Sequence, residues 1–387
     1  MSKINVRNLS NENEDGAPDI VGVTTFSATS YFVPTKGTTA QRPSDHLEEG
    51  SIRYNTDIKN LEYYRGHTIG WVQFELIDPD LGGGTGSNTG LGTRGLIFNA
   101  SVPGDNETNT IEFITISTMG AQQDFGDTTV SVRQRGALSN SVRALGGGGF
   151  DGSNRSDRID AVTIASQGNS TDFGNMIATI LGSPAGISDQ VRGIFGGGEV
   201  PGNTDVIQYV SISQEGNMID FGDLTTSKNT MSGGSSSTRG IFAGGNPGSK
   251  TNTIEFITIS TTGNAQDFGD LTVEKRNAAK GQSSNSIKHI VFGGQITPTV
   301  TNVIDIITIA TLGNSVDFGD APTPIENGAA VASSTRAVFL GGKENDDTTH
   351  TRIDSMEFAT SGEVTSFGTL STAASGGVGC SNGHGGL

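Results

Sequence analysis

One segment recurs six times along the chain, at intervals of 47 to 50 residues. Its most constant element is Asp-Phe-Gly, which becomes Ser-Phe-Gly in the last copy. The residues of this ladder are Asp124, Phe125, Asp172, Phe173, Asp220, Phe221, Asp267, Phe268, Asp317, Phe318 and Phe367. A repeat of this length typically forms one supersecondary unit that buries its apolar surface against its neighbours. The chain is therefore expected to fold as an array of similar units.

Two further patterns keep the same period. An apolar run rich in Ile and Thr begins at Ile111, Ile159, Ile207, Ile254, Ile304 and Ile353. A basic residue opens a second short apolar run, at Arg94, Arg143, Arg192, Arg239, Lys288 and Arg336. Glycine clusters follow most of these runs, although the first repeat has Asn99-Ala-Ser instead. Because the three patterns share one phase, each repeat is a single structural unit.

The runs predict strands rather than helices. Ile, Thr and Phe favour strands, and the chain has 57 glycines, which disfavour long helices. Gly, Asn, Asp and Ser between the runs supply turn residues. A unit of four short strands over about 40–50 residues is typical of a propeller blade. The predicted fold is all-β: a six-bladed β-propeller of four-stranded blades. A parallel β-helix is the alternative, but its rungs are usually much shorter.

The phase of the repeat predicts how the array closes. The first repeat begins at Arg94 and lacks the strand that precedes the basic residue in the other repeats. The surplus strand lies at the other end, over residues 374–382. We expect this C-terminal strand to pair with the first repeat, because an open array would leave two unpaired edges.

The repeats resemble the kelch family over residues 93–387. The resemblance lies in Ile241-Phe-Ala-Gly-Gly, Ile254-Glu-Phe and Asp267-Phe-Gly-Asp, with Phe where the family usually has Trp. It implies a binding or scaffolding module. Copper oxidases of similar fold need a Tyr–Cys pair and histidines. The residues of those types here follow no repeated motif: Tyr209, Cys380, His289, His350 and His384. We therefore expect no enzyme activity, no cofactor and no metal site.

Residues 1–92 differ in composition from the repeats. They hold four of the five tyrosines and the single tryptophan. We expect residues 1–33 to be an arm that orders on assembly, residues 34–80 a β-hairpin anchor domain, and residues 81–92 a glycine-rich linker. Tyr54, Tyr63 and Trp71 are expected to pack across the hairpin.

This region resembles a segment of tailed-bacteriophage fibres and other virion appendages. The matching runs are Gly37-Thr-Thr-Ala-Gln-Arg-Pro, Gly50-Ser-Ile-Arg-Tyr-Asn-Thr-Asp, Leu61-Glu-Tyr-Tyr and Gly70-Trp. The repeats also look like those in virion proteins of marine cyanobacterial phages. The resemblance implies a structural virion protein, assembled in the host cytoplasm, whose residues 1–80 bind other virion proteins. A tail fibre is the first expectation and a head or capsid fibre the second. A homo-oligomer is expected.

Charge and composition limit the other partners. The formal net charge is −17, which disfavours binding to nucleic acid or to an anionic membrane surface. No apolar run approaches the roughly 20 residues of a membrane-spanning helix. The single cysteine, Cys380, excludes an internal disulfide framework. A host-surface glycan or protein remains the expected ligand of the propeller.

The regular charges admit structural and functional interpretations. We expect each basic ladder residue to pair with a ladder aspartate, while an anion-holding ring around the axis is the alternative. Asp127, Asp223, Asp270 and Asp320 are expected to serve turns, with Ca²⁺ binding as the alternative. Six variable segments connect equivalent strands and are expected to form one recognition face. They are Pro103–Thr108, Phe150–Asp157, Pro201–Asp205, Asn246–Thr251, Ile296–Thr301 and Glu344–Thr349. A carbohydrate-active propeller enzyme is the alternative of a different class.

Overall fold

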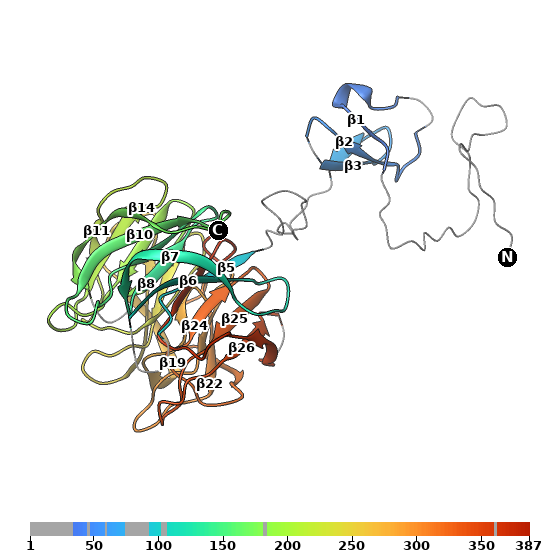
Figure 1. Cartoon of the computed structure of the whole chain (residues 1–387). Helices are drawn as coiled ribbons and strands as arrows, with labels where there is room; N and C mark the ends of the chain where they lie inside the picture. Colours follow the sequence, from blue (N-terminus) through green and yellow to red (C-terminus); the bar gives the residue numbers. More distant parts are fainter. Residues whose placement is uncertain are drawn as a thin grey trace. The chain divides into compact units, whose positions relative to one another are not determined.

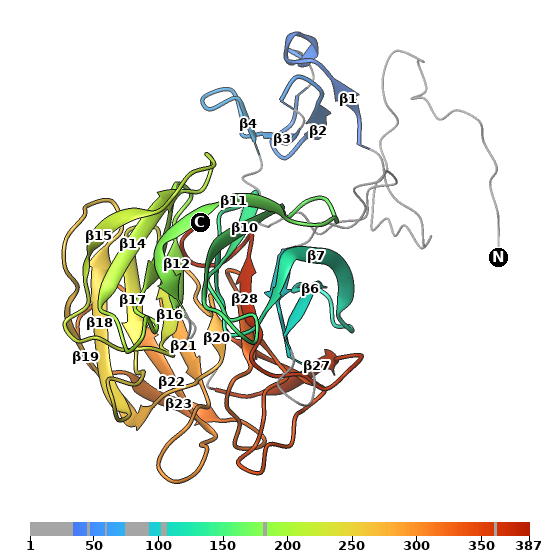
Figure 2. The ribbon, with the colours of Figure 1, turned by 60° about the vertical axis from the view of Figure 1, so that its left-hand side comes forward.

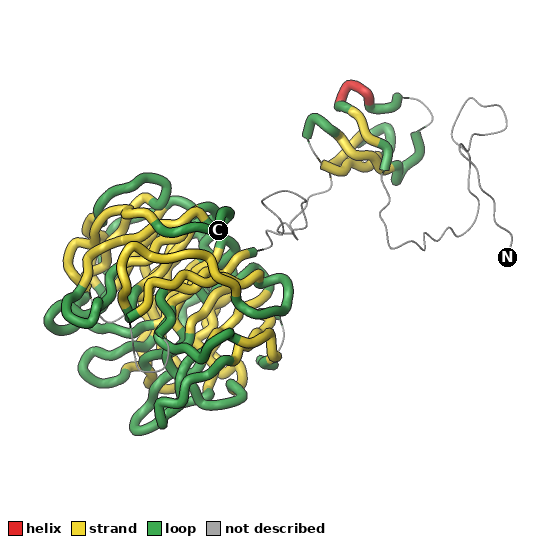
Figure 3. The backbone as a smooth tube through the Cα atoms, in the orientation of Figure 1, coloured by secondary structure: helices red, strands yellow, loops and turns green. Residues whose placement is uncertain are grey.

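The structure is a computed structural model that describes residues 34–44, 47–58, 60–73, 93–101, 107–180, 184–359 and 362–387. The chain divides into two compact units, Met1–Ile77 and Asp78–Leu387. Both units are all-β in the described residues, and the only helix there is a short 3-10 turn, Thr39–Gln41 (Figure 3). The predicted arm, residues 1–33, and the predicted linker, residues 81–92, lie outside the described residues.

The N-terminal unit is a sheet of four short strands. They are β1 (Lys36–Gly37), β2 (Ile52–Asn55), β3 (Asn60–Tyr64) and β4 (Trp71–Gln73), in the order β1-β2-β3-β4. Tyr54 and Tyr63 share one face of this sheet, because Tyr54 lies opposite Leu61 and Tyr63 lies opposite Ile52. Trp71 lies opposite Tyr64 instead, with ring centroids 5.5 Å apart. Trp71 therefore packs on the opposite face of the sheet from Tyr54 and Tyr63.

The larger unit contains the strands β5 to β28, which are grouped below by sequence repeat (Figure 1). The bounds are β5 (Arg94–Phe98), β6 (Thr108–Thr115) and β7 (Gln123–Val132); β8 (Gly136–Ser139), β9 (Arg143–Gly147), β10 (Ser156–Thr163) and β11 (Thr171–Ile180); β12 (Ala185–Ser188), β13 (Arg192–Gly196), β14 (Val206–Ser211) and β15 (Ile219–Asp223); β16 (Ser232–Ser235), β17 (Arg239–Ala243), β18 (Thr251–Thr258) and β19 (Gln266–Lys275); β20 (Lys280–Gly281), β21 (Lys288–Phe292), β22 (Val303–Thr308) and β23 (Val316–Asp320); β24 (Ala329–Ala332), β25 (Arg336–Leu340), β26 (Arg352–Glu357) and β27 (Thr365–Thr369); and finally β28 (Val378–Ser381).

Within a group, consecutive strands pair antiparallel, as in β8-β9-β10-β11. Figure 2 shows the fourth group running from β19 on the outside to β16 in the interior, near β20 and β28. The apolar side chains of neighbouring groups meet between the sheets. One such cluster joins Leu138 of the second repeat to Phe195 and Ile212 of the third. The prediction of an all-β fold with four-stranded units is confirmed at this level.

The C-terminal strand supplies the strand that the first repeat lacks. β28 pairs antiparallel with β5, with Cys380 opposite Leu96, as the sequence predicted. The Oδ1 atom of Asn382 accepts a hydrogen bond from the backbone N–H of Arg94 at 2.7 Å. Asn140 makes the same bond to Arg143 across the covalent turn between β8 and β9, also at 2.7 Å. The chain end thus reproduces the turn of an intact repeat without a covalent connection.

The fifth repeat departs from the pattern. Its first strand, β20, pairs in parallel with β24 and β28, so that the sixth and first groups join into a curled sheet of nine strands. The remaining strands, β21–β23, form a three-stranded sheet. This segment still bonds the second strand of its own repeat, because the N–H of Ala279 donates to the carbonyl of Phe292 and the N–H of Ile290 donates to that of Ser283, both at 3.0 Å. His289 is a buried imidazole at a position where the other repeats have Gly or Ala, and it lies opposite Ser284 in an isolated bridge.

The Asp-Phe-Gly motif is the point where one repeat docks on the next. The backbone N–H of Gly263 donates to the carbonyl of Phe221 at 2.8 Å, and four other repeat pairs make the equivalent bond. Gly222 has φ +147°, and a Cβ there would lie 2.5 Å from the carbonyl of Gly263. Glycine is therefore required by both backbone angle and space. The bond from Gly120 to Phe367 joins the first repeat to the sixth.

Candidate functional site

The basic ladder joins successive repeats through backbone carbonyls. Arg94 donates from Nη1 to the carbonyl of Ile164 in the second repeat at 3.0 Å. Arg336 of the sixth repeat reaches the carbonyl of Ile116 in the first at 3.3 Å. The other four bonds are Arg143 to Ile212, Arg192 to Ile259, Arg239 to Ile309 and Lys288 to Phe358. The six bonds run in one direction and return to their starting point.

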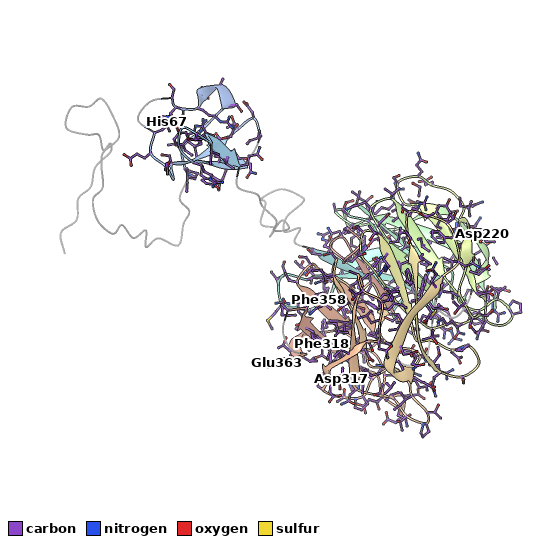
Figure 4. The ribbon with its side chains drawn as sticks, turned by 180° about the vertical axis from the view of Figure 1, so that it is seen from behind. His67, Asp220, Asp317, Phe318, Phe358 and Glu363 are labelled. Carbon is purple, nitrogen blue, oxygen red and sulfur yellow. The ribbon has the colours of Figure 1, made fainter. Side chains whose placement is uncertain are left out.

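The expected pairing of these cations with the ladder aspartates was wrong. The ladder phenylalanines are buried or half-buried, but the preceding aspartates point to the exposed side, as alternation along a strand requires. Figure 4 labels Asp220 and Asp317 at the surface of the repeat body. Instead, the guanidinium of Arg94 lies over the ring of Phe113, 4.7 Å from its centroid, and Arg239 lies over Phe256 at the same distance. The aromatic rings thus cover guanidinium groups that already donate to backbone carbonyls. The described residues of the basic ladder do not form a ring of cations around an axis that could hold an anion.

The second acidic ladder contributes its backbone to the joints between repeats. The backbone N–H of Asp127 donates to Oδ1 of Asn169 in the next repeat at 3.0 Å. Asp223 and Asp270 make the equivalent bonds to Asn264 and Asn314. Among the described residues, no group of three or more His, Cys, Asp or Glu side chains could hold a metal ion. The Ca²⁺ interpretation of these residues thus gains no geometric support.

The sequence analysis missed a buried acidic position. The residue that follows the first isoleucine of the third strand is acidic in five repeats and is Gln208 in the other. Three of these carboxylates form ion pairs whose side chains are almost completely buried: Arg135–Asp160 at 2.6 Å, Lys228–Glu255 at 2.9 Å and Lys275–Asp305 at 2.7 Å. The recurrence of an acidic residue within an apolar run could have revealed this position in the sequence. An acidic residue that recurs at one position of a buried strand indicates that a basic side chain lies beside it.

Glu112, at this position in the first repeat, has no such cation. Burial and the nearby Asp124 raise the pKa of Glu112. Ala374 stands where the fourth and fifth repeats carry Lys228 and Lys275, and it lines a small cavity beside Glu112. We predict that Ala374→Lys stabilises the fold by about 0.5–1 kcal/mol, since it supplies the missing partner of a half-buried carboxylate. Denaturant unfolding should show the gain for Ala374→Lys and no gain for Ala374→Lys combined with Glu112→Gln.

A chain of serine hydroxyls surrounds the interior end of the inner strands. Ser188 donates to the carbonyl of Ser139 at 2.6 Å, and Ser139 donates to that of Ser381 at 2.8 Å. The other links are Ser235 to Ser188, Ser284 to Ser235 and Ser381 to Ala332. The inner strands of all six repeats therefore converge here.

Two side chains fill the space that these strands enclose. Gln282 is fully buried and bonds Ser139 and Ser188, on the opposite side from its own strand. His384 is 2% exposed, and its Nε2 lies 2.8 Å from the carbonyl of Ser139. The side chains of Gln282 and His384 thus lie between the inner strands and bond them.

Burial lowers the pKa of His384 to about 4. A histidine that stays neutral in the fold but protonates near pH 6.5 when unfolded stabilises the fold above pH 6.5, and this contribution is lost as the pH falls toward 4. We predict a loss of about 2–3 kcal/mol from this group between pH 7 and pH 4. Denaturant unfolding should show a weaker pH dependence for His384→Gln than for the wild type. His289, whose pKa burial also lowers to about 4, provides the same comparison within the fifth repeat.

The six variable segments leave the opposite ends of the strands from the serine chain. Each follows the second strand of its repeat at a left-handed residue, such as Gly197 with φ +63° or Asn99 with φ +52°. In the first segment, residues 102–106 lie outside the described residues. We call the surface formed by the described parts of these segments the loop face. Neighbouring segments contact one another there. Arg155 pairs with Glu199 at 3.1 Å, and Asn203 donates to the carbonyl of Asn246 at 2.6 Å.

A polar cavity of about 80 Å³ lies at the start of the inner strands on this face. Its lining comes from the first, second, fifth and sixth repeats and includes Arg133, Lys280 and Lys343. At the other ends of the second strands, the turns carry exposed apolar residues: Val142, Val191 and Ile287. The loop face is thus the surface where variable loops and a polar cavity coincide.

No protein-family model matches the chain, and no curated protein matches it significantly. In the part of the chain that the structure describes, no helix is long and apolar enough to cross a membrane. The candidate site therefore rests on geometry and on residue chemistry.

Proposed function

We propose that the repeat body is a six-bladed β-propeller, closed by β28. Three sets of contacts support this proposal, because each passes from repeat to repeat and joins the sixth to the first. They are the bonds of the basic ladder, the joints at Asp-Phe-Gly and the serine chain. In this arrangement the fourth strand of each blade faces outward, and the loop face is one of the two flat ends.

We further propose that the chain is a structural virion protein of a tailed bacteriophage, a tail fibre or another appendage, without catalytic activity. The observation that carries the recognition role is the loop face, where the variable connections and one polar cavity lie at the same end of the strands. Rigid scaffolds commonly present binding residues on such loops. The virion assignment rests on the resemblance of residues 37–71 to appendage segments.

The N-terminal sheet has a surface that suits attachment. Ile52, Tyr54, Leu61, Tyr63 and Val72 share one face, on which all five are half-buried or exposed. The other face holds Glu62, which is bound by Arg42 at 2.6 Å and by Asn55 at 3.1 Å. Small sheets are marginally stable alone, so that an apolar face of this kind favours packing on another virion protein or on a second copy.

Figure 4 labels His67 in this unit, where its Nδ1 lies 3.0 Å from the Tyr64 hydroxyl.

Location tests the virion assignment. Gold-labelled antibodies against the repeat body should mark an appendage of intact particles in electron micrographs. Labelling on the head would favour the head or capsid fibre. A protein found only in the soluble fraction of infected cells, and never on particles, would overturn the assignment.

Binding tests the recognition role. The full chain should bind host-surface glycans on an array, and the variant Lys250→Ser combined with Asp346→Ser on the loop face should weaken binding. Val142→Ser, on the opposite flat end, is the matched control and should bind as the wild type does. Hydrolysis of the same glycans would instead favour the carbohydrate-active enzyme.

A further inference from the structure

The cavity on the loop face is positive in a strongly acidic protein. The cations in its wall are Arg133, Lys280 and Lys343, and none of the described residues that line it is acidic. The whole chain has a formal net charge of −17. Three separate repeats supply the three cations, so that folding concentrates positive charge that the sequence disperses.

Lys280 is the most deeply placed of the three cations, at 4% exposure. Burial, partly opposed by Glu326 and reinforced by Lys343, lowers the pKa of Lys280 to about 8. Its surroundings therefore favour the ammonium less than water does. An anion in the cavity would offset this loss of solvation.

Three carboxylates lie near these cations. Glu107 lies 3.3 Å from Nε of Arg133, and Asp347 lies 2.6 Å from Nζ of Lys343. Glu326 acts electrostatically on Lys280 and accepts a hydrogen bond from Asn277 at 3.0 Å. None of these three carboxylates lines the cavity, so that the charged side chains of its wall are all basic.

Neutral donors complete the wall. Ser101 and Ser375 pair through their backbones and contribute to the lining, together with the amide of Asn327. Asn327 is held in the left-handed region at φ +57°, and its carbonyl accepts the N–H of Gly376 at 2.7 Å. Hydroxyls and amides beside cations are the groups that bind oxyanions.

We propose that this cavity binds one oxyanion group, a sulfate or carboxylate of an acidic sugar in a host-surface polysaccharide. The proposal rests on the proposed function for the source of the ligand, but the site itself does not. A water molecule needs about 10–15 Å³ of cavity, so that 80 Å³ holds a few waters or one small oxyanion. The sugar ring would lie outside, among the loops. Recognition would thus combine one charged anchor with contacts from the variable segments.

Inorganic sulfate tests the site without the polysaccharide. Calorimetric titration of the full chain with sodium sulfate, against sodium chloride at equal ionic strength, should show saturable binding that Lys280→Met weakens at least tenfold. Lys36→Met is the matched control, because Lys36 is an exposed lysine of β1 in the N-terminal sheet and does not line the cavity, and this variant should bind sulfate as the wild type does. Equal binding by all three proteins, or no saturable binding by the wild type, would overturn the proposal.

Lys343→Gln provides a second variant if Lys280→Met fails to fold, since Lys343 is only half-buried. It should weaken sulfate binding while thermal unfolding without sulfate stays cooperative. If sulfate affinity is unchanged in this variant, the cavity is not the site.

A polysaccharide arm separates this inference from the proposed function. Dextran sulfate should compete with inorganic sulfate for the wild-type chain, whereas uncharged dextran should not. Sulfate binding that dextran sulfate leaves unchanged would overturn the acidic-sugar assignment and keep the anion site. Glycan binding that is unaffected by Lys280→Met would keep the recognition role and overturn the anchor.

Discussion

Removal of residues 376–387 is expected to abolish cooperative folding of the repeat body. The truncation takes away β28, which pairs with β5 on the side opposite to β6. Leu96, Phe98 and Cys380 are completely buried at this pairing, and the edge of β5 would become exposed. The same truncation removes His384 from the interior. Circular dichroism should show no cooperative thermal transition from the repeat body, and size-exclusion chromatography should show aggregation.

A transplanted strand is the control for this truncation. Residues 374–381 can be placed before residue 94 of the truncated chain, joined by a copy of the turn formed by residues 140–142. That turn already connects β8 to β9 with the geometry that Asn382 reproduces at Arg94. The transplanted chain should recover most of the cooperative transition. A truncated chain that melts cooperatively at the wild-type temperature would contradict the structural role of β28.

Arg135→Met is expected to destabilise the fold by about 3–5 kcal/mol, because it leaves a buried carboxylate without its cation. Both Arg135 and Asp160 have fully buried side chains, and their contact is 2.6 Å. Arg135 also donates to the carbonyl of Gly146 at 2.9 Å. The free energy of unfolding in guanidinium chloride measures the loss.

Two further variants isolate the buried charge. Arg135→Met combined with Asp160→Asn should recover part of the loss, since no ionised group then stays unpaired. Arg158→Met removes the partner of Asp172 in a solvent-exposed pair and should change stability by less than about 1 kcal/mol. A similar loss from Arg158→Met and Arg135→Met would show that burial of the pair has no special importance.

The sequence could predict the repeat and its phase because the constraints are local. Strand residues, turn residues and the glycine of Asp-Phe-Gly occur at fixed spacing, and the missing first strand had to be supplied from residues 374–382. The buried Asp160 was equally periodic, but its cation Arg135 lies three residues away from the position of Lys228 and Lys275. When the basic partner of a recurring acidic residue occupies different positions in different repeats, the repeat period alone does not identify it.

Other features of the structure depend on packing that the repeat period does not predict. The cations of the basic ladder bind backbone carbonyls, and because every residue has a backbone carbonyl, the sequence does not show which one is bound. β20 pairs in parallel with β24 and β28, and in the described residues no strand pairing of this kind joins the other inner strands of the repeats. Tyr63 and Tyr64 are adjacent, so that only the strand register decides which ring meets Trp71. The cavity on the loop face joins residues from repeats that are distant in sequence.

The basic ladder donates to backbone carbonyls, and this has a consequence for how the sequences of the repeats can diverge. Every amino acid has a backbone carbonyl, so that the residue receiving Arg239 or Lys288 can change without loss of the bond: it is Ile309 in one case and Phe358 in the other. Figure 4 shows Phe358 beside Phe318, with which it shares an apolar cluster. Substitutions at the cation and at the acceptor position should therefore not covary among descendants. Each copy can evolve its own loops while the joints between copies stay intact.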